Sequence, residues 1–395
     1  MRILYLNHNV AWSGTFFRAY HLGRELARRG HEVTVVTTRR TGRFTVNATV
    51  RDGVRLIQMP DLWWGPARNG FDPWNTFRRV LLLRHAEYDL VHAFDSRPVV
   101  VLPALWVRAR TGARLCMDWA DWWGRGGSIE ERSGWLVRTF FGPIETWFEE
   151  SFRHRADGTT VISSALAERA AGLGIPRERI LRFPVGCDVD GLRPQSRAQA
   201  REALQLAGDQ AIILHLGVLK RRDSDLLFDA FRALRRQFPA AQLVLIGNVG
   251  ARVPHDLATA GAVRAPGFVT YEEMSRWVGA ADVCVIAMLD SVGNRGRWPG
   301  KINDYLAAGR PVVMSRVGDA ARMVAEGKAG WTAEPTPQGL AGALERALRD
   351  PDGRETAGRC ARSLAESKLS WGTLASELEG FYAKVMADQP YHRRD

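Results

Sequence analysis

Residues 296–313 combine a loop rich in glycine and proline with a short predicted helix that carries Lys301 and Asp304. The first turn of a helix exposes unpaired N–H groups and the positive end of the helix dipole, and both attract phosphate. Asp304, one turn further along, is placed to accept a hydrogen bond from a sugar hydroxyl. Gly309 and Pro311 end the helix before an apolar strand. The segment predicts a site for a phosphorylated sugar compound.

A second candidate phosphate site follows Gly217, where Lys220, Arg221 and Arg222 lie together at the start of a predicted helix. Three cations are unfavourable at the positive end of a helix dipole unless an anion neutralises them. A bound diphosphate would do so, and the sequence leaves open which of the three residues holds it. The alternative interpretation is a solvated cluster of charges.

Two shorter loops extend this set of candidates. Gly14 and Thr15 lie between the first predicted strand and the first predicted helix. A glycine there permits close approach to the backbone, and either Ser13 or Thr15 can cap the helix. Asn294, Arg295 and Arg297 precede the helix at Lys301 and offer hydrogen-bond donors to phosphate or sugar. An ordinary turn and a solvated loop are the respective alternatives.

Asp118 and Asp121 are the candidate groups for acid–base chemistry. They lie at the end of a predicted strand, 114–119, among the tryptophans of the segment Trp119-Ala-Asp-Trp-Trp123. In a parallel α/β domain the carboxyl ends of the strands face the ligand crevice. A carboxylate in a tryptophan-lined cleft could hold sugar hydroxyls or accept a proton. A helix cap or a loop charge is the alternative.

Strands and helices alternate along both halves of the sequence. Short apolar runs such as 33–36 suit strands buried on both faces of a parallel sheet, and the helices between them indicate doubly wound α/β domains. A polar stretch at 190–199 separates the halves. The predicted strands are 2–7, 32–38, 54–59, 89–94, 114–119 and 159–163 in the first half, and 211–217, 242–247, 263–269, 283–288 and 311–315 in the second.

Composition limits the class of protein. The chain has 395 residues, 46% hydrophobic and 25% charged, which suits two globular domains. No apolar run is long enough to span a bilayer, the first residues do not resemble a signal peptide, and four scattered cysteines show no metal or disulfide spacing. We therefore expect a soluble cytoplasmic protein. The net charge of +12 suits phosphorylated ligands or an anionic membrane, whereas no nucleic-acid-binding module is present. The alternative is a compositional bias in which arginine replaces lysine without a functional role.

Aromatic and basic residues are interleaved in two stretches of the first half, 63–84 and 135–148. The first contains Trp63, Trp64 and Arg68, among others. Such a pattern suits a surface that lies on an anionic membrane and presents a lipid-linked acceptor. The alternative is that many of these rings belong to the core.

The segment Pro299-Gly-Lys-Ile-Asn-Asp-Tyr-Leu-Ala-Ala-Gly-Arg-Pro-Val-Val313 resembles the donor-site motif of retaining glycosyltransferase family 4, which has the GT-B fold. That family often reads Pro-x-Lys-x-x-Glu-Tyr-Leu-Ala-x-Gly-x-Pro-Val-Val. This chain has Asp304 in place of the glutamate, and Gly296 where many members have a further acidic residue. It also has Val218 where the family has an arginine, and Asp118 near the position of the family's histidine.

The resemblance implies a fold of two doubly wound, Rossmann-like domains facing a central cleft. The implied parts are an acceptor-binding domain at 1–188, a nucleotide-sugar-binding domain at 189–370, and a helix at 371–395 that crosses back to the first domain. The implied donor-binding residues are Gly14, Thr15, Gly217, Lys220, Arg221, Arg222, Val269, Asn294, Arg295, Gly300, Lys301 and Asp304. Asp118, Asp121 and Lys301 are the candidate catalytic residues.

The implied activity is transfer of a sugar, most simply a hexose, from a nucleotide-diphosphate sugar to a glycan or lipid-linked acceptor. It proceeds with retention and without a metal ion or cofactor. Cell-envelope polysaccharide or glycolipid synthesis at the inner face of the plasma membrane would be its setting. The alternatives are a sugar-nucleotide epimerase of the same fold and a non-catalytic sugar-nucleotide-binding protein.

Overall fold

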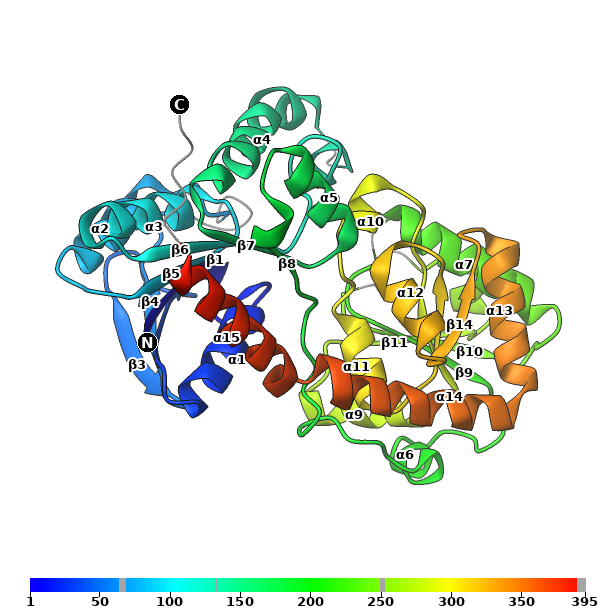
Figure 1. The fold of residues 1–395 in the computed structure, drawn as a ribbon. Coiled ribbons are helices and arrows are strands. Elements are labelled where there is room, and N and C mark those ends of the chain that lie inside the picture. The colour runs from blue at the N-terminus through cyan, green and yellow to red at the C-terminus, as the bar shows by residue number, and fades with distance from the viewer. Residues whose placement is uncertain (64–68, 132–133, 220, 249–252, 389–395) are drawn as a thin grey trace. The chain divides into compact units, whose positions relative to one another are not determined.

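The computed structural model describes residues 1–63, 69–131, 134–219, 221–248 and 253–388 (Figure 1). The chain forms two compact units. The first comprises Met1–Pro184 with Trp371–Asp395, and the second comprises Val185–Ser370. Each unit is a Rossmann-like α/β domain built on a parallel sheet. No helix in the described part of the chain is both long and apolar enough to cross a bilayer.

The first unit has an eight-stranded sheet in the order β3-β4-β2-β1-β5-β6-β7-β8. All neighbours are parallel except β3 and β4. The strands are β1 Arg2–Val10, β2 Glu32–Thr38, β3 Asn47–Arg51, β4 Val54–Met59, β5 Leu90–Phe94, β6 Arg114–Trp119, β7 Gly158–Val161 and β8 Ile180–Arg182. The hairpin strand β3 and the short edge strand β8 were not predicted. Most side chains of β3 are exposed and lack an apolar pattern, and β8 has only three residues.

Helices cover both faces of the first sheet, with α1 and α15 on one face and α2 and α3 on the other (Figure 1). They are α1 Phe16–Arg28, α2 Pro73–Leu83, α3 Pro98–Thr111, α4 Gly142–Ser151, α5 Ser164–Gly172 and α15 Trp371–Ala387. A π-helical turn, Val137–Phe141, precedes α4. The last helix is joined to the sheet by a 2.9 Å hydrogen bond between the buried hydroxyls of Tyr5 and Tyr382.

The second unit has a six-stranded, wholly parallel sheet in the order β11-β10-β9-β12-β13-β14. Its strands are β9 Ile212–Leu216, β10 Gln242–Ile246, β11 Val263–Gly267, β12 Val283–Ile286, β13 Val312–Ser315 and β14 Gly330–Ala333. The central strands are fully buried, which explains their continuous apolar runs.

The helices of the second unit are α6 Arg197–Ala203, α7 Arg221–Arg235, α8 His255–Thr259, α9 Tyr271–Ala280, α10 Val292–Gly296, α11 Lys301–Ala307, α12 Gly318–Glu326, α13 Pro337–Arg349 and α14 Pro351–Leu364. Leucines, phenylalanines and alanines of α7 and α13 pack on one side of the sheet, against valines and leucines of its strands. The polar stretch 190–199 does not run unstructured to its end, because Ser196 caps α6 with a bond to the N–H of Gln199.

Candidate active site

Lys301 begins α11, as the sequence predicted, and its ammonium group lies against β9. Its Nζ is 2.7 Å from Nε2 of His215 and 3.3 Å from the carbonyl oxygen of Val218. Nδ1 of His215 donates to the carbonyl oxygen of Val285 at 3.0 Å, so Nε2 carries the lone pair that accepts from Lys301. Burial, and then Lys301 itself, hold the pKa of His215 well below its usual value. His215 is therefore a neutral imidazole that orients the ammonium group.

The two charged groups of α11 have perturbed pKa values. Burial lowers the pKa of Lys301 to about 7, and the nearby Arg297 acts in the same direction. Burial raises the pKa of Asp304 to about 7, and the neighbouring Asp188 adds to this shift. A polyanion beside Lys301 would restore its charge, because an opposite charge favours the ionised form. Such perturbation is common at functional sites.

Gly217 lies directly beside Lys301. Its φ of +74° is in the left-handed region, and a Cβ at this position would lie 3.9 Å from Nζ of Lys301. A cavity of about 150 Å³ opens here. It is smaller than the roughly 300–1,000 Å³ of typical ligand sites, so it suits only part of a ligand, such as its phosphates. The residues that line it are His215, Val218, Leu219, Asp223, Ile286, Ala287, Met288, Arg297, Trp298, Pro299 and Lys301.

Asn294, predicted as a ligand contact, is held behind this cavity by its amide nitrogen, while its Oδ1 has no hydrogen-bond partner among the described residues. It is buried, and its Nδ2 donates to Oδ1 of Asp223 at 3.2 Å and to the carbonyl oxygen of Leu289 at 2.7 Å. The other oxygen of Asp223 accepts from Nη2 of Arg297 at 2.9 Å. Arg295 instead forms an exposed ion pair with Asp290.

The remaining predicted donor residues of this unit occupy loops and helix ends. Arg221 and Arg222 are exposed in the first turn of α7, whereas Lys220 lies outside the described residues. Gly300 immediately precedes Lys301 and opens α11. Val269 is half-buried between β11 and α9, next to Phe268, whose side chain is 86% exposed.

Gly14 and Thr15 form a loop in the first unit, but Thr15 does not cap α1 with its side chain. Its hydroxyl instead bonds to the side chains of Asn7, at 2.9 Å, and Asn9. A Cβ at Gly14 would lie 2.7 Å from Nδ2 of Asn9, and its φ is +55°. Position 14 thus requires a glycine because its backbone lies close to the side chain of Asn9 in the same loop.

Asp118 is completely buried at the end of β6, and its oxygens are all engaged. Arg18 of α1 donates to both oxygens, through Nη2 at 3.1 Å and Nε at 3.2 Å, and the hydroxyl of Thr160 donates at 2.5 Å. Arg18 is buried too and also bonds to the carbonyl oxygen of Phe183. In this geometry Asp118 has no oxygen left to make the predicted contact with a sugar. Its carboxylate forms a structural ion pair instead.

Asp121 is half-buried in the loop that follows β6. Glu149 of α4 shapes this loop, because its carboxylate accepts from Nε1 of Trp119 at 2.9 Å and from the N–H groups of Trp123 and Gly124 at 2.8 and 2.7 Å. Burial raises the pKa of Glu149. Of the two predicted catalytic carboxylates, Asp121 is the one that remains accessible.

His215, Asp223 and Arg18 were not among the predicted site residues. Some signal was present for two of them: His215 is a lone polar residue in an apolar strand, and Asp223 stands in the first turn of a helix beside two cations. Nothing local marks Arg18, because its partner lies 100 positions away. Only the packing of α1 on the sheet brings that pair together.

Two domain families match the chain. Residues 13–186 match the Glycosyl transferase 4-like domain, and residues 210–350 match Glycosyl transferases group 1. The second match contains the whole of the cavity beside Lys301. Together they span most of both units.

Relatives and solved structures agree with these matches. The GDP-mannose-dependent alpha-(1-6)-phosphatidylinositol monomannoside mannosyltransferase of Mycolicibacterium smegmatis is 25% identical, covering 89% of this chain and 90% of that protein. D-inositol 3-phosphate glycosyltransferase 1 of Catenulispora acidiphila is also 25% identical, covering 92% and 88%. The structure of sucrose-phosphate synthase from Thermosynechococcus elongatus shares the fold, with a TM-score of 0.79 at 20% identity, over 98% of this chain and 100% of that one.

The chain therefore belongs to the GT-B glycosyltransferases, with a glycosyl transferase 4-like domain followed by a glycosyl transferases group 1 domain. It is an enzyme of that class, as its relatives are. The resemblance and the fold class predicted from the sequence are confirmed.

Proposed function

We propose that this enzyme transfers a hexose from a nucleoside-diphosphate sugar to an acceptor hydroxyl, with retention of configuration and without a metal ion. The observation that carries this proposal is the arrangement at the start of α11. There, Lys301 faces Gly217 and neutral His215 at the carboxyl ends of parallel strands, where α/β domains bind nucleotides.

The chemistry needs charge stabilisation more than covalent catalysis. The bond between the sugar's C1 and the diphosphate oxygen breaks, and a bond from C1 to the acceptor oxygen forms on the same face. The acceptor proton passes to the departing diphosphate. Lys301 and the N–H groups at the start of α11 would stabilise the negative charge that develops, and positioning supplies the rest. Asp304 would hold hydroxyls of the donor.

The relatives indicate which substrates to test first. One is named for GDP-mannose and a phosphatidylinositol mannoside, and the other for inositol 3-phosphate. We propose a glycan or a lipid-linked acceptor, in cell-envelope glycolipid or polysaccharide synthesis at the cytoplasmic face of the membrane. A free inositol phosphate is the water-soluble alternative that the second name suggests.

A donor screen followed by product analysis tests this function. The full chain is incubated with GDP-mannose, UDP-glucose and related donors, with and without EDTA, and its melting temperature is measured. A donor at 100 times its Kd should stabilise the protein by about 2.7 kcal/mol. Product from the best donor and acceptor is then examined by NMR for its anomeric configuration.

The product separates the candidate functions. An inverted anomeric centre would refute retention, and binding abolished by EDTA would refute metal independence. Conversion of the donor sugar without an acceptor would indicate an epimerase. Binding without transfer or hydrolysis, across the acceptors named above, would indicate a non-catalytic protein.

The variant Asp304→Asn should bind the donor more weakly yet fold more stably. It loses a charged acceptor, so the donor KM should rise roughly tenfold or more. Because folding raises the pKa of Asp304 from 3.8 to about 7, the stability tied to its protonated form is lost as the pH rises through 7. The variant's gain in melting temperature over wild type should therefore be larger at pH 8 than at pH 5.5. Unchanged donor affinity would remove Asp304 from the donor site.

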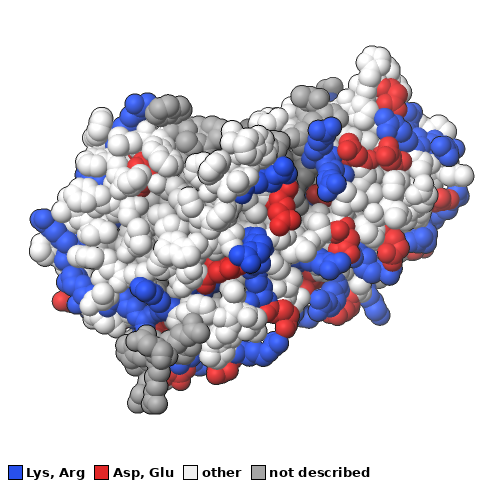
Figure 2. All heavy atoms as spheres, turned by 90° about the horizontal axis from the view of Figure 1, so that it is seen from above, with Lys and Arg blue, Asp and Glu red and all other residues white. Residues whose placement is uncertain are grey.

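An exposed apolar surface supports membrane contact by the first unit. It is formed by residues just before the π-helical turn, on that turn and on α4, which are 46–65% exposed: Trp135, Leu136, Phe140, Phe141, Ile144 and Trp147. We call it the α4 surface. Figure 2 shows a mainly uncharged area over the first unit, bordered by Lys and Arg and with few Asp or Glu. Exposed apolar patches of this kind mark interaction sites. Of the rings expected to face a membrane, Trp64 lies outside the described residues.

The α4 surface should bind anionic vesicles reversibly. Basic residues near such a membrane contribute about 1 kcal/mol each, and salt screens that part, whereas buried rings resist salt. We expect the protein to sediment with phosphatidylglycerol vesicles at low salt and partly at high salt. The double change Trp135→Ser and Phe140→Ser should weaken binding about tenfold, and the exposed Val50→Ser on β3 serves as control. Equal vesicle binding by the double variant and by the Val50→Ser control would refute a role of the α4 surface in membrane contact.

A further inference from the structure

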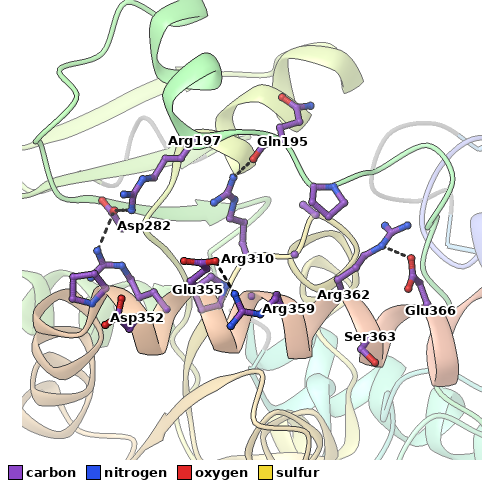
Figure 3. Close-up of a pocket in the computed structure, with 17 residues that line it drawn as sticks. Gln195, Arg197, Asp282, Arg310, Asp352, Glu355, Arg359, Arg362, Ser363 and Glu366 are labelled. Atoms are coloured by element: carbon purple, nitrogen blue, oxygen red, sulfur yellow. Dashed lines mark hydrogen bonds and ion pairs between the residues drawn. The ribbon is translucent and has the colours of Figure 1, made fainter.

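A cavity of about 580 Å³ lies in the second unit and shares no lining residue with the cavity at Lys301 (Figure 3). Asp282 and Arg310 line it from just before β12 and β13, and Gln195 lines it from just before α6. In a parallel sheet all amino ends of the strands lie together, opposite all carboxyl ends, and Gly217 follows the carboxyl end of β9. The larger cavity therefore lies at the amino ends of the strands, opposite the candidate donor site.

Positive charge is concentrated around one buried carboxylate at this edge. Asp282 pairs with Arg197 at 2.6 Å, with Arg201 at 2.8 Å and, more distantly, with Arg354 at 3.8 Å. An N–H of Ile212 also donates to Asp282. Three guanidinium groups thus share one carboxylate, and since arginine stays protonated in proteins the surplus charge persists.

Arg310 adds a fourth guanidinium to this cluster without a carboxylate of its own. In Figure 3 it lies between Gln195 and Arg197 on one side and α14 on the other. Among the described residues the one hydrogen-bond partner of its guanidinium group is the carbonyl oxygen of Gln195, at 2.6 Å, and its Nε is buried without a partner. Burial, with help from Arg197 and Arg201, lowers the pKa of Arg310. The buried Nε of Arg354 is likewise unpaired.

Three other carboxylates line the cavity, and Asp352, at the start of α14, is exposed to solvent. Glu355 pairs with Arg359 at 2.7 Å, and Glu366 pairs with Arg362 at 2.6 Å. Both pairs are on or just after α14, and the glutamates are exposed. An unpaired buried N–H and an uncompensated cation are both costly. An anion in the cavity would offset the uncompensated positive charge.

We propose that this arginine cavity binds a small phosphate monoester, such as a sugar phosphate, at a site separate from that of the nucleotide sugar. Guanidinium groups bind phosphate through paired, charge-assisted hydrogen bonds. Arg310 and Arg354 line the cavity with incompletely paired guanidinium groups, and Arg197 stands at the rim with its side chain 44% exposed. The volume lies in the range of small-molecule sites.

Titration of the full chain with inorganic phosphate tests this site, with chloride adjusted to keep ionic strength constant. Wild type should show saturable binding by calorimetry. Arg310→Gln and Arg197→Gln should each weaken that binding roughly tenfold or more, as expected for a lost charge-assisted bond. Lys301→Ala should leave it in place. Arg276→Gln is the matched control, since Arg276 is an exposed arginine of α9 paired with Glu272 and lies outside the cavity.

The outcomes separate this site from the donor site. Phosphate binding that is lost with Lys301→Ala but kept by both cavity variants would place the anion at the donor site and overturn the proposal. The absence of saturable binding to wild type would overturn it too. Arg197 is partly exposed, so Arg197→Gln should fold. Its phosphate binding therefore tests the proposed site even if Arg310→Gln does not fold.

Discussion

The variant Lys301→Ala should lose 100- to 1,000-fold in kcat/KM for the nucleotide sugar, the size of effect seen when one stabiliser of a developing negative charge is removed. In the wild-type protein, Nζ of Lys301 contacts a neutral histidine and a carbonyl oxygen but, among the described residues, pairs with no carboxylate. The ammonium group is therefore available to a diphosphate. Lys384→Ala, at an exposed position of α15, is the control. Unchanged kinetics in a folded Lys301→Ala protein would remove this residue from the site.

The pH profile gives the same assignment a second readout. Because the pKa of Lys301 is lowered to about 7, the free enzyme loses this cation as the pH rises above 7, and kcat/KM should fall. Because the pKa of Asp304 is raised to about 7, its carboxylate is lost as the pH drops below 7. A bell-shaped profile centred near pH 7 is expected. Lys301→Arg should remove the alkaline limb, and Asp304→Asn should remove the acid limb.

The variant Asp118→Ala should destabilise the first unit by about 3–5 kcal/mol, the cost of leaving a buried ion-pair partner alone. Arg18 would keep its charge in a site with almost no exposure. For a unit of this size that loss corresponds to a fall of about 10 °C in melting temperature. Calorimetry would measure it.

Two comparisons separate a structural from a catalytic role for this carboxylate. The double change Arg18→Met with Asp118→Leu removes both charges and should recover much of the stability. Asp121→Ala, at the half-buried position, should cost little stability but lower turnover if the loop after β6 serves the acceptor. Full stability with lost transfer in Asp118→Ala would instead show a direct catalytic role.

Local sequence was sufficient for most strands of the parallel sheets, though not for β8 and β14, and for the helix that carries Lys301 and Asp304. Continuous apolar runs can be buried on both faces only in a layered α/β unit, and Gly309 with Pro311 ends α11 without help from distant residues. These features depend on near neighbours, so their pattern is visible in the sequence. Exposed strands such as β3 lack that pattern and were missed.

Tertiary structure alone decided which candidate side chains are free to bind. Asn294 and Asp118 have ligand-like chemistry, yet Asp223 and Arg18, each at least 71 positions away, engage them inside the protein. His215 acquires its role only because β9 and α11 pack side by side. The physical reason is that burial and pairing come from contacts distant in sequence. A residue's type shows what chemistry it can do, and packing determines whether it meets solvent, a ligand or another side chain.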